Sequence, residues 1–232
     1  MAERVNVYIA DIEYYMDETH FTEGLAHISR ERRAAIGRLR AQKDKVRSLC
    51  CGLLLHYGLY DLGYTDNESW TIAYGEKGKP YFTDHPDVCF NLSHSGDYVA
   101  CAIADRPVGI DIQNERKTIP GMERTVCPED DLNTLYQTDE ERHLHILESF
   151  SAKEAYLKYT GMGMSIGFPN VLVDRKEGTA CLSDGSGAAF LQRIALPEQP
   201  NYRIFVCYSK LFTVYTNIPH NNLIHEKFSS NE

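Results

Sequence analysis

The sequence predicts an α+β protein of two similar α/β halves, residues 1–105 and 106–232, each with helices and a small antiparallel sheet. Each half contains one long segment whose apolar residues recur at helical spacing. Several short segments with strand-like alternation accompany that helix in each half. A polar break at Asp-Arg-Pro, residues 105–107, separates two of these strand-like segments. We place the seam between the halves there.

Composition indicates an ordinary globular protein. The chain has 232 residues, 43% hydrophobic and 25% charged, which excludes a disordered, collagenous or coiled-coil protein. No apolar run approaches the ~18 residues that a membrane helix needs, and the N-terminus has no secretory signal, so we expect a cytoplasmic protein without membrane contact. The seven cysteines are odd in number and form no Cys-x-x-Cys pair, which favours reduced core cysteines over disulfides or a zinc site.

Charge is unevenly distributed along the chain. The net charge is −9, which argues against a general nucleic-acid binder. Residues 29–48 nevertheless hold eight basic and two acidic side chains, so this segment carries +6 and the rest of the chain −15. This basic segment predicts a site for a small anionic ligand or an acidic partner, with a solvated helix face as the alternative.

The first half contains one long helix in this interpretation, over residues 29–60, with Ser29 at its start and Gly58 and Gly63 marking its end. A turn rich in Gly and Lys, ending at Lys79 and Pro80, lies between two short strands. The predicted strands of this half are 6–12, 70–74, 81–82, 88–92 and 98–104.

The second half repeats this arrangement. A helix is predicted between residues 128 and 160, ended by Gly161 and Gly163. The polar tail from about residue 217 is expected to fray. The predicted strands are 108–112, 171–174, 188–194 and 202–209.

The first motif with chemical potential is Val108-Gly-Ile-Asp-Ile-Gln113. An aspartate on a buried strand is costly unless it binds something. Asp111 and Gln113 point to the same face because side chains alternate along a strand. Two oxygen ligands from one strand suit Mg²⁺. A strand-end aspartate that caps a turn is the alternative.

Two further motifs carry polar groups. In Phe150-Ser-Ala-Lys-Glu-Ala-Tyr-Leu-Lys158, Glu154 and Lys158 are four residues apart and share a helical face, as in an ordinary surface ion pair. In Phe90-Asn-Leu-Ser-His-Ser-Gly96, a strand leads into a polar turn where Ser93 and His94 can grip a phosphate, joined by Lys79.

In this order, the segments resemble 4′-phosphopantetheinyl transferases of the surfactin-synthetase-activating (Sfp) type. The pattern is Gly-Lys-Pro, then Phe-Asn-Leu-Ser-His-Ser, Val-Gly-Ile-Asp-Ile, and Phe-x-x-Lys-Glu-Ala-x-x-Lys. The resemblance spans residues 28–163, and residues 124–129 are similar to the segment that links the two halves in this family. It implies halves related by a pseudo-twofold axis, with coenzyme A in the cleft between them.

The resemblance also implies roles for individual residues. Asp111 and Glu154 match Mg²⁺ ligands, with Gln113 at the position of a third, and Asp111, Glu154 and Lys158 match the catalytic group beside the pyrophosphate. The coenzyme A contacts that it implies are Arg32, Arg47, Lys79, Pro80, Ser93, His94 and Lys158, with Arg47 and His94 at the 3′-phosphate.

Two positions depart from the family pattern. Ala35 stands where some members carry a lysine, which removes one phosphate contact. Gln113 stands where the family usually has glutamate, so the formal charge of the three-ligand site falls from −3 to −2. This departure bears on metal affinity more than on the class of reaction.

The implied reaction is a Mg²⁺-dependent transfer of 4′-phosphopantetheine from coenzyme A to a serine of an apo acyl or peptidyl carrier protein. Adenosine 3′,5′-bisphosphate is the product released, and the enzyme is expected to act as a monomer. Two alternatives are a non-catalytic module that binds coenzyme A or a carrier, and a Mg²⁺-dependent phosphodiesterase that uses the same carboxylates. Retention of Asp111, Glu154 and Lys158 together argues against a pure binding module.

Overall fold

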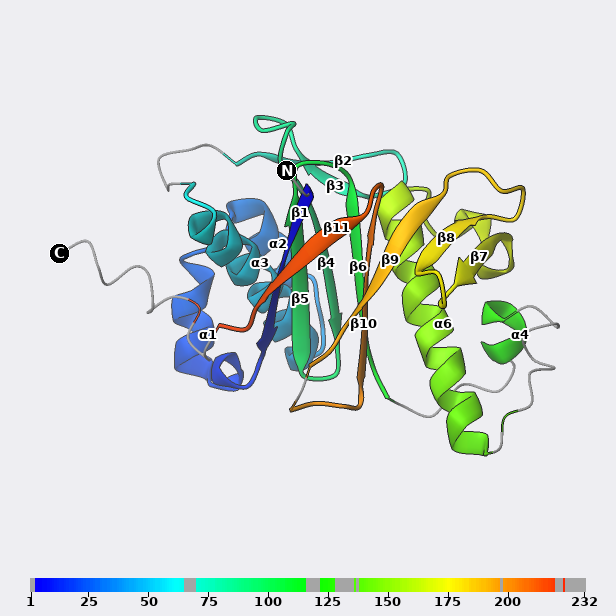
Figure 1. Ribbon diagram of the computed structural model, residues 1–232. Coiled ribbons are helices and arrows are strands. Elements are labelled where there is room, and N and C mark those ends of the chain that lie inside the picture. Colours follow the sequence, from blue (N-terminus) through cyan, green and yellow to red (C-terminus); the bar gives the residue numbers. More distant parts are fainter. Residues whose placement is uncertain are drawn as a thin grey trace.

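The computed structural model describes residues 3–64, 70–115, 122–127, 136, 138–196, 198–219 and 223. It confirms the α+β class, with two larger sheets packed between helices (Figure 1). Among the described residues, no helix is long and apolar enough to cross a membrane.

The first sheet has the strand order β11-β1-β5-β4 and combines both ends of the chain. β1 is antiparallel to β5, which is antiparallel to β4, whereas β11 runs parallel to β1. The strands are β1 (Glu3–Asp11), β4 (Cys89–Ser95), β5 (Tyr98–Ala104) and β11 (Phe212–Asn217). The strand nearest the C-terminus therefore completes a sheet made otherwise from the first 105 residues.

The second sheet, in the order β6-β10-β9-β8-β7, is antiparallel throughout. A separate hairpin of β2 and β3 holds the Gly-Lys turn. The strands of the second sheet and the hairpin are β6 (Val108–Asn114), β7 (Val171–Asp174), β8 (Thr179–Leu182), β9 (Ala189–Ile194), β10 (Tyr202–Tyr208), β2 (Ile72–Tyr74) and β3 (Pro80–Phe82).

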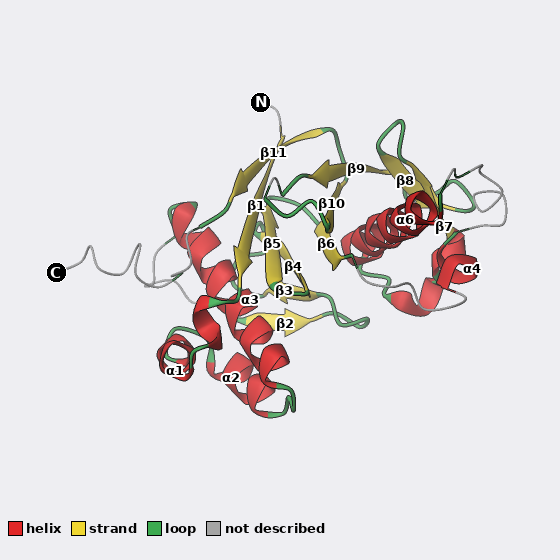
Figure 2. Cartoon of the chain, turned by 90° about the horizontal axis from the view of Figure 1, so that it is seen from below, coloured by secondary structure: helices red, strands yellow, loops and turns green. Residues whose placement is uncertain are grey.

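Helices cover the outer faces of the two sheets, which pack against each other at the centre (Figures 1 and 2). The first sheet carries α1 (Glu18–Leu25), α2 (Arg30–Gly37) and α3 (Gln42–Asp61), and the second carries α6 (Asp139–Thr160). The remaining helical segments are α4 (Met122–Val126) and the 3₁₀ turns η1 (Tyr14–Met16), η2 (Met164–Ile166) and η3 (Phe168–Asn170).

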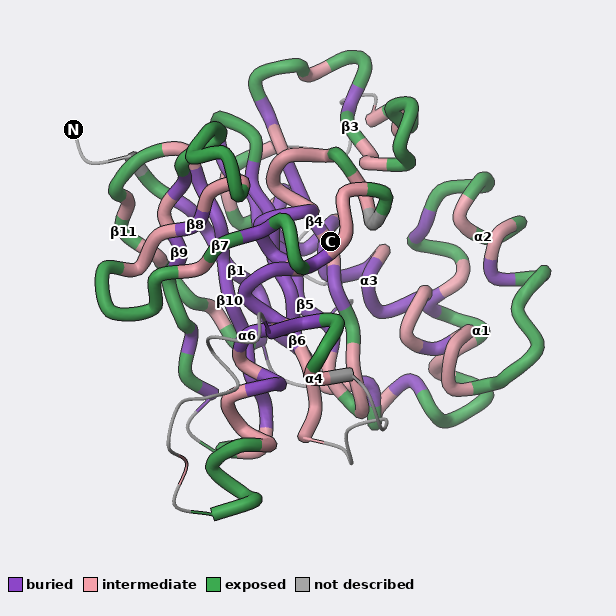
Figure 3. The backbone as a smooth tube through the Cα atoms, turned by 90° about the vertical axis from the view of Figure 1, so that its right-hand side faces the viewer, coloured by how far each residue is buried: buried purple, intermediate pink, exposed green. Residues whose placement is uncertain are grey.

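Alternation along the strands divides the interior into three apolar cores. On β5, Val99, Cys101 and Ile103 face α3, whereas Ala100 and Ala102 face the second sheet. β10 alternates in the same way, with its other face packed against α6. The buried residues accordingly concentrate in the strands and in the inner faces of the helices (Figure 3).

The prediction of one helix over residues 29–60 is wrong. Ser29 does cap a helix, since its Oγ accepts the Arg32 amide hydrogen bond at 3.2 Å, but that helix ends at Gly37. A second one, α3, starts at residue 42 after Ala41, which is extended. Glycine is costly inside a helix, about 1 kcal/mol relative to alanine, and Leu39, which a continuous helix would bury, is exposed.

Gly58 does not end α3, as the sequence had indicated. The helix continues to Asp61, and Gly58 is instead a point of close packing against β1 and β5. A Cβ at this position would lie 2.8 Å from carbons of Tyr8 and Ile103. The glycine after the helix, Gly63, has a φ of 92°, so it fits the predicted helix end.

The second long helix, α6, starts at Asp139 and has well-defined ends. Thr138 forms a capping box with Glu141 at the start of α6, and Gly161 ends it in the left-handed conformation with φ 70°. Residues 128–135 of the predicted helix lie outside the described residues. In the C-terminal segment expected to fray, Asn217 ends β11 and Leu223 is buried in the first core, while residues 220–222 and 224–232 lie outside the described part.

Candidate active site

The site forms where β4 of the first sheet runs beside β6 of the second. The two strands share no ladder of backbone hydrogen bonds among the described pairings; side chains of β4 accept hydrogen bonds from backbone N–H groups of β6 instead. The accepting residues alternate along β4, so they share one face. The three bonds are Ile110 N to Asn91 Oδ1 (2.8 Å), Ile112 N to Ser93 Oγ (3.3 Å) and Asn114 N to Ser95 Oγ (3.0 Å).

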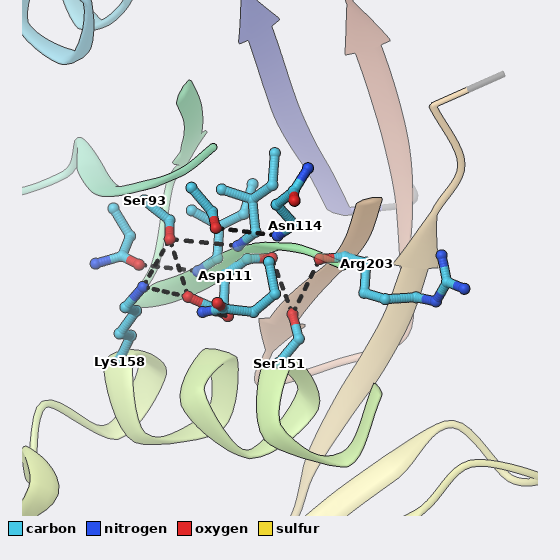
Figure 4. A network of polar contacts seen from close by, with 11 residues as sticks. Ser93, Asp111, Asn114, Ser151, Lys158 and Arg203 are labelled. Atoms are coloured by element: carbon cyan, nitrogen blue, oxygen red, sulfur yellow. Dashed lines mark hydrogen bonds and ion pairs between the residues drawn. The ribbon is translucent and has the colours of Figure 1, made fainter. Parts of the chain in front are cut away.

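Asp111 is the centre of a polar network at this junction (Figure 4). Its Oδ1 accepts hydrogen bonds from Ser93 Oγ at 2.9 Å and from Lys158 Nζ at 2.7 Å, and its Oδ2 accepts one from Gln113 Nε2 at 2.9 Å. Lys158 Nζ also donates to Ser93 Oγ at 2.9 Å. The side chain of Asp111 is 2% exposed, so Lys158 supplies a positive charge that a buried carboxylate requires.

Glu154 lies one helical turn before Lys158 and has a different environment. It is half-buried, and its carboxylate makes no hydrogen bond or ion pair with any described residue. Burial raises the pKa of Glu154, opposed by the charge of Lys158 and reinforced by that of Asp111. This carboxylate is therefore the group at the site that most lacks a cation.

Two residues that the sequence interpretation did not single out hold α6 against β6. Gly109 lies directly under the helix, because a Cβ there would come within 2.1 Å of the Ala155 carbonyl oxygen. Ser151 is fully buried, and its Oγ lies 3.3 Å from the Asp111 carbonyl oxygen and 3.2 Å from that of Arg203. Together they set how Glu154 and Lys158 face Asp111.

Lys153 points away from the site, although it precedes Glu154. Its side chain is buried and Nζ donates to the Phe168 carbonyl oxygen at 3.1 Å. Of the two lysines in this motif, only Lys158 reaches Asp111 among the described contacts.

A cavity of about 270 Å³ opens beside Glu154 and Lys158. Both halves of the sequence line it: the Gly-Lys turn and β4 on one side, and α6 with the loop after it on the other. The lining residues are Lys77, Gly78, Lys79, Pro80, Asn91, Leu92, Glu154, Leu157, Lys158, Gly161 and Gly163. Of the predicted site residues, Lys79, Pro80, Glu154 and Lys158 thus share one cavity.

Lys79 ties the Gly-Lys turn to the second half. Its Nζ donates to the Tyr159 carbonyl oxygen at 2.7 Å and to that of Val108 at 3.1 Å. Burial lowers the pKa of Lys79 to about 8. The ammonium group thus bonds to backbone carbonyls while the side chain lines the cavity.

Arg47 and His94 lie close enough to interact electrostatically, and neither is among the residues that line this cavity. Arg47 Nε and Nη2 donate to the Gly96 carbonyl oxygen, and Nη1 forms an ion pair with Asp44 at 3.0 Å. Desolvation by surrounding atoms, and then the charges of Arg47 and Lys158, lower the pKa of the exposed His94. Desolvation is the largest cause of this shift, and the positive charges of Arg47 and Lys158, which an anion would offset, add to it.

Arg32 is the predicted residue that the structure separates from this group. Its Nη1 donates to the Ser48 carbonyl oxygen at 3.2 Å, and its side chain lines a different cavity, of about 100 Å³, beside α3. The basic segment therefore divides, with Arg47 near the Asp111 network and Arg32 on the side of α3 that faces Trp70.

The two halves of the chain thus meet at a carboxylate–lysine pair, Asp111 and Lys158, next to a cavity that both halves line. A model of the 4′-phosphopantetheinyl transferase superfamily matches residues 107–207, and one of the N-terminal part of 4′-phosphopantetheinyl transferases matches residues 15–106. The chain belongs to this family and is a 4′-phosphopantetheinyl transferase by class, as its sequence motifs predicted.

Named relatives agree with this assignment. The chain is 32% identical to the 4′-phosphopantetheinyl transferase psf-1 of Bacillus pumilus, with 79% of each chain covered. It is 30% identical to a 4′-phosphopantetheinyl transferase of Bacillus subtilis, over 79% of this chain and 83% of the relative. Identity to the transferase Sfp of Bacillus subtilis strain 168 is 26%, with the same coverage. The Sfp-type resemblance is confirmed.

Proposed function

We propose that the protein transfers 4′-phosphopantetheine from coenzyme A to a serine hydroxyl of an apo acyl or peptidyl carrier protein. The serine oxygen forms a bond to the phosphorus nearest pantetheine, and the bond from that phosphorus to the bridging oxygen of the pyrophosphate breaks. Adenosine 3′,5′-bisphosphate leaves with the electron pair. The observation that carries the proposal is the unpaired Glu154 carboxylate beside the Asp111–Lys158 pair, at a cavity lined by both halves.

We propose Mg²⁺ as the cofactor, held by Asp111 and Glu154, with Gln113 as the third candidate ligand. The donor set fits, since carboxylate and amide oxygens are hard ligands and Glu154 forms no direct ion pair with a described residue. Within the described part of the chain, no three His, Cys, Asp or Glu side chains gather as a metal site. The amide oxygen of Gln113 is the candidate for the third position. When bound, Mg²⁺ neutralises charge on the pyrophosphate.

Lys158 and Glu154 have complementary roles in this proposal. Lys158 is already fixed by Ser93 and Asp111, so it presents a positive charge to the developing phosphate charge at little cost in ordering. Glu154 accepts the proton of the attacking serine, directly or through a water molecule. Burial raises the pKa of Glu154, which makes the ionised form a better base than a solvated glutamate.

We assign coenzyme A recognition to Arg47 and His94 and to the Gly-Lys turn. Arg47 and His94 face the 3′-phosphate, Lys79, Pro80 and Ser93 line the nucleotide part of the cleft, and Arg32 extends the basic surface. Arg47 offers a forked donor that suits a phosphate, and the basic segment attracts the nucleotide. Coenzyme A in a cleft between pseudo-twofold-related halves is part of this proposal.

We also propose that the protein is a cytoplasmic monomer. Its seven cysteines are free, and in the cytoplasm they would stay reduced.

The proposal is tested by incubating several apo carrier proteins with coenzyme A and the protein, with and without excess EDTA, and measuring carrier mass. We expect one added phosphopantetheine on a carrier serine and no addition when the metal is chelated. Unchanged modification in EDTA would contradict the metal assignment. Coenzyme A binding with no modification of any carrier would favour the non-catalytic module.

A further inference from the structure

A second group of basic side chains gathers on another face of α6. Glu148 lies six residues before Glu154, which at about 3.6 residues per turn places the two carboxylates on different faces of the helix. Three arginines from different elements surround Glu148. They are Arg175 after β7 (Nη1 to Oε2, 2.9 Å), Arg193 on β9 (Nη1 to Oε1, 3.1 Å) and Arg203 on β10 (Nε to Oε1, 3.4 Å).

The carboxylate of Glu148 does not neutralise the basic side chains around it. With Lys176 beside Arg175, the distal basic cluster (Arg175, Lys176, Arg193, Arg203) carries four positive charges against the one of Glu148. Asp174 and Glu177, which flank Arg175 and Lys176 in the sequence, reduce this excess from +3 to +1. The protein as a whole carries −9, so this excess is local. Ion pairing alone would therefore leave the cluster short of negative charge.

Several donors of the cluster are unused. Arg203 is buried with 6% exposure; its Nε meets Glu148 as an ion pair but not as a hydrogen bond, and its Nη1 donates to the carbonyl oxygens of Pro200 and Tyr202. Arg193 contacts Glu148 through Nη1 alone, and no described residue pairs with the ammonium group of Lys176. Arg193 and Lys176 are exposed, so these donors are accessible from solvent.

A cavity of about 380 Å³ lies at this cluster. The cavity is lined by Glu148 and by three basic residues of the cluster, Arg175, Lys176 and Arg193. Arg203 does not line it, but it lies on the same face of β10 as Phe205, which does. The apolar part of the lining is formed by Val173, Leu191 and Phe205. The cavity thus combines a polar, positively charged side with an apolar side, as ligand sites do.

We propose that this cavity is an anion-binding site for a phosphate monoester with a compact apolar body. The phosphate would bind Arg193 and Lys176, because the terminal nitrogens of Arg175 already bond to Glu148 and His145. The apolar body would cover Leu191 and Phe205. A dianion suits an excess of positive charge, and guanidinium groups bind phosphate through paired hydrogen bonds. A concave site of this volume favours a small molecule over an acidic protein surface. The site is separate from the transferase centre, so it does not depend on the proposed function.

Phenyl phosphate is the probe, titrated into ¹⁵N-labelled full-length protein while the amide signals of Gly178 and Leu191 are followed by NMR. We expect saturable shifts that Arg193→Ala weakens about tenfold, since it removes a charge-assisted donor. Glu148→Gln should tighten binding several-fold, because it removes the carboxylate that competes for the same arginines. Arg142→Ala, an exposed arginine on α6 outside the cavity, is the charge-matched control and should leave the affinity unchanged.

Several results would overturn the proposal. One is the absence of saturable shifts at Gly178 and Leu191, and another is equal affinity in wild type and Arg193→Ala. Weaker binding in a folded Glu148→Gln variant would show that the arginines serve only to pair with Glu148. Hexaglutamate that shifts these signals when phenyl phosphate does not would assign the surface to an acidic protein. Within the proposal, vesicles with phosphatidic acid and soluble phenyl phosphate distinguish a lipid headgroup from a soluble ligand.

Discussion

Gln113 determines the charge that the Asp111 strand presents at the site. Its Nε2 now donates to Asp111 Oδ2, which a glutamate could not do. Gln113→Glu adds a carboxylate beside two others, which attracts a divalent cation more strongly. Desolvation and repulsion among the carboxylates offset most of this attraction, so we expect a net gain of about 1 kcal/mol, or several-fold in affinity. We expect the Mg²⁺ concentration for half-maximal transfer to fall by that factor. A half-saturation point that does not move would mean that residue 113 is not a ligand.

Arg47 is the residue whose removal should mimic loss of the 3′-phosphate. A charge-assisted hydrogen bond contributes about 1.5–3 kcal/mol, so Arg47→Ala should bind coenzyme A roughly ten- to a hundredfold more weakly in calorimetry. Dephospho-coenzyme A should show a similar loss with the wild-type protein, and the two losses should not add. Arg38 and Arg40 are exposed controls. If alanine at Arg38 or Arg40 weakened coenzyme A binding as much as alanine at Arg47, the basic segment would attract the ligand only by its overall charge.

His94 gives this recognition a pH dependence with a defined sign. Desolvation, Arg47 and Lys158 lower the pKa of His94 in the free protein, and a bound phosphate dianion would raise it again. Binding then takes up a proton, so affinity for coenzyme A relative to dephospho-coenzyme A should rise as pH falls from about 8 to about 6.5. Calorimetric titrations of both ligands at each pH measure this ratio. His94→Asn should flatten it, and an unchanged slope in that variant would remove His94 from the 3′-phosphate site.

The contact between α6 and β6 is the packing on which the site depends. Gly109→Ala would place a methyl group within 2.1 Å of the backbone of α6, which cannot yield as a flexible side chain could. We expect a loss of about 1–3 kcal/mol in unfolding free energy, as for other overpacked sites, and a fall in transfer rate because α6 moves relative to Asp111. Urea denaturation and the transfer assay measure the two effects.

Gly37→Ala is the matched control, because a Cβ at Gly37 meets nothing within 4 Å. A Gly109→Ala protein as stable and as active as Gly37→Ala would contradict the close packing of α6 on β6.

Local pattern predicted most individual strands, but it missed β8 and β11 and the break in the first long helix. β7 was predicted with its observed bounds, since the β-branched Val171 and Val173 alternate along it. β11 was missed, because its strand state comes from parallel pairing with β1 at the other end of the chain. The long first helix was predicted without its break, since apolar spacing continues through Leu39 although the chain turns there.

Across the whole molecule, the sequence motifs identified the central site residues, and the structure shows which of them form hydrogen bonds with one another. Asp111, Gln113, Ser93 and Lys158 form one network, as their motifs indicated in part. The supporting residues could not be found from any single segment. Asn91 and Ser151 act across the junction between β4, β6 and α6, and the only local sign was the alternation of Asn91 with Ser93.

The most direct test of the central claim is coenzyme A binding and carrier modification by Glu154→Gln, measured together on a protein with a wild-type unfolding transition. Glutamine keeps the size of the side chain and removes its charge and its basicity. We predict that coenzyme A still binds through Arg47 and His94, while transfer to an apo carrier, followed by mass spectrometry with Mg²⁺ present, is abolished. A folded Glu154→Gln protein that modifies the carrier at the wild-type rate would contradict it.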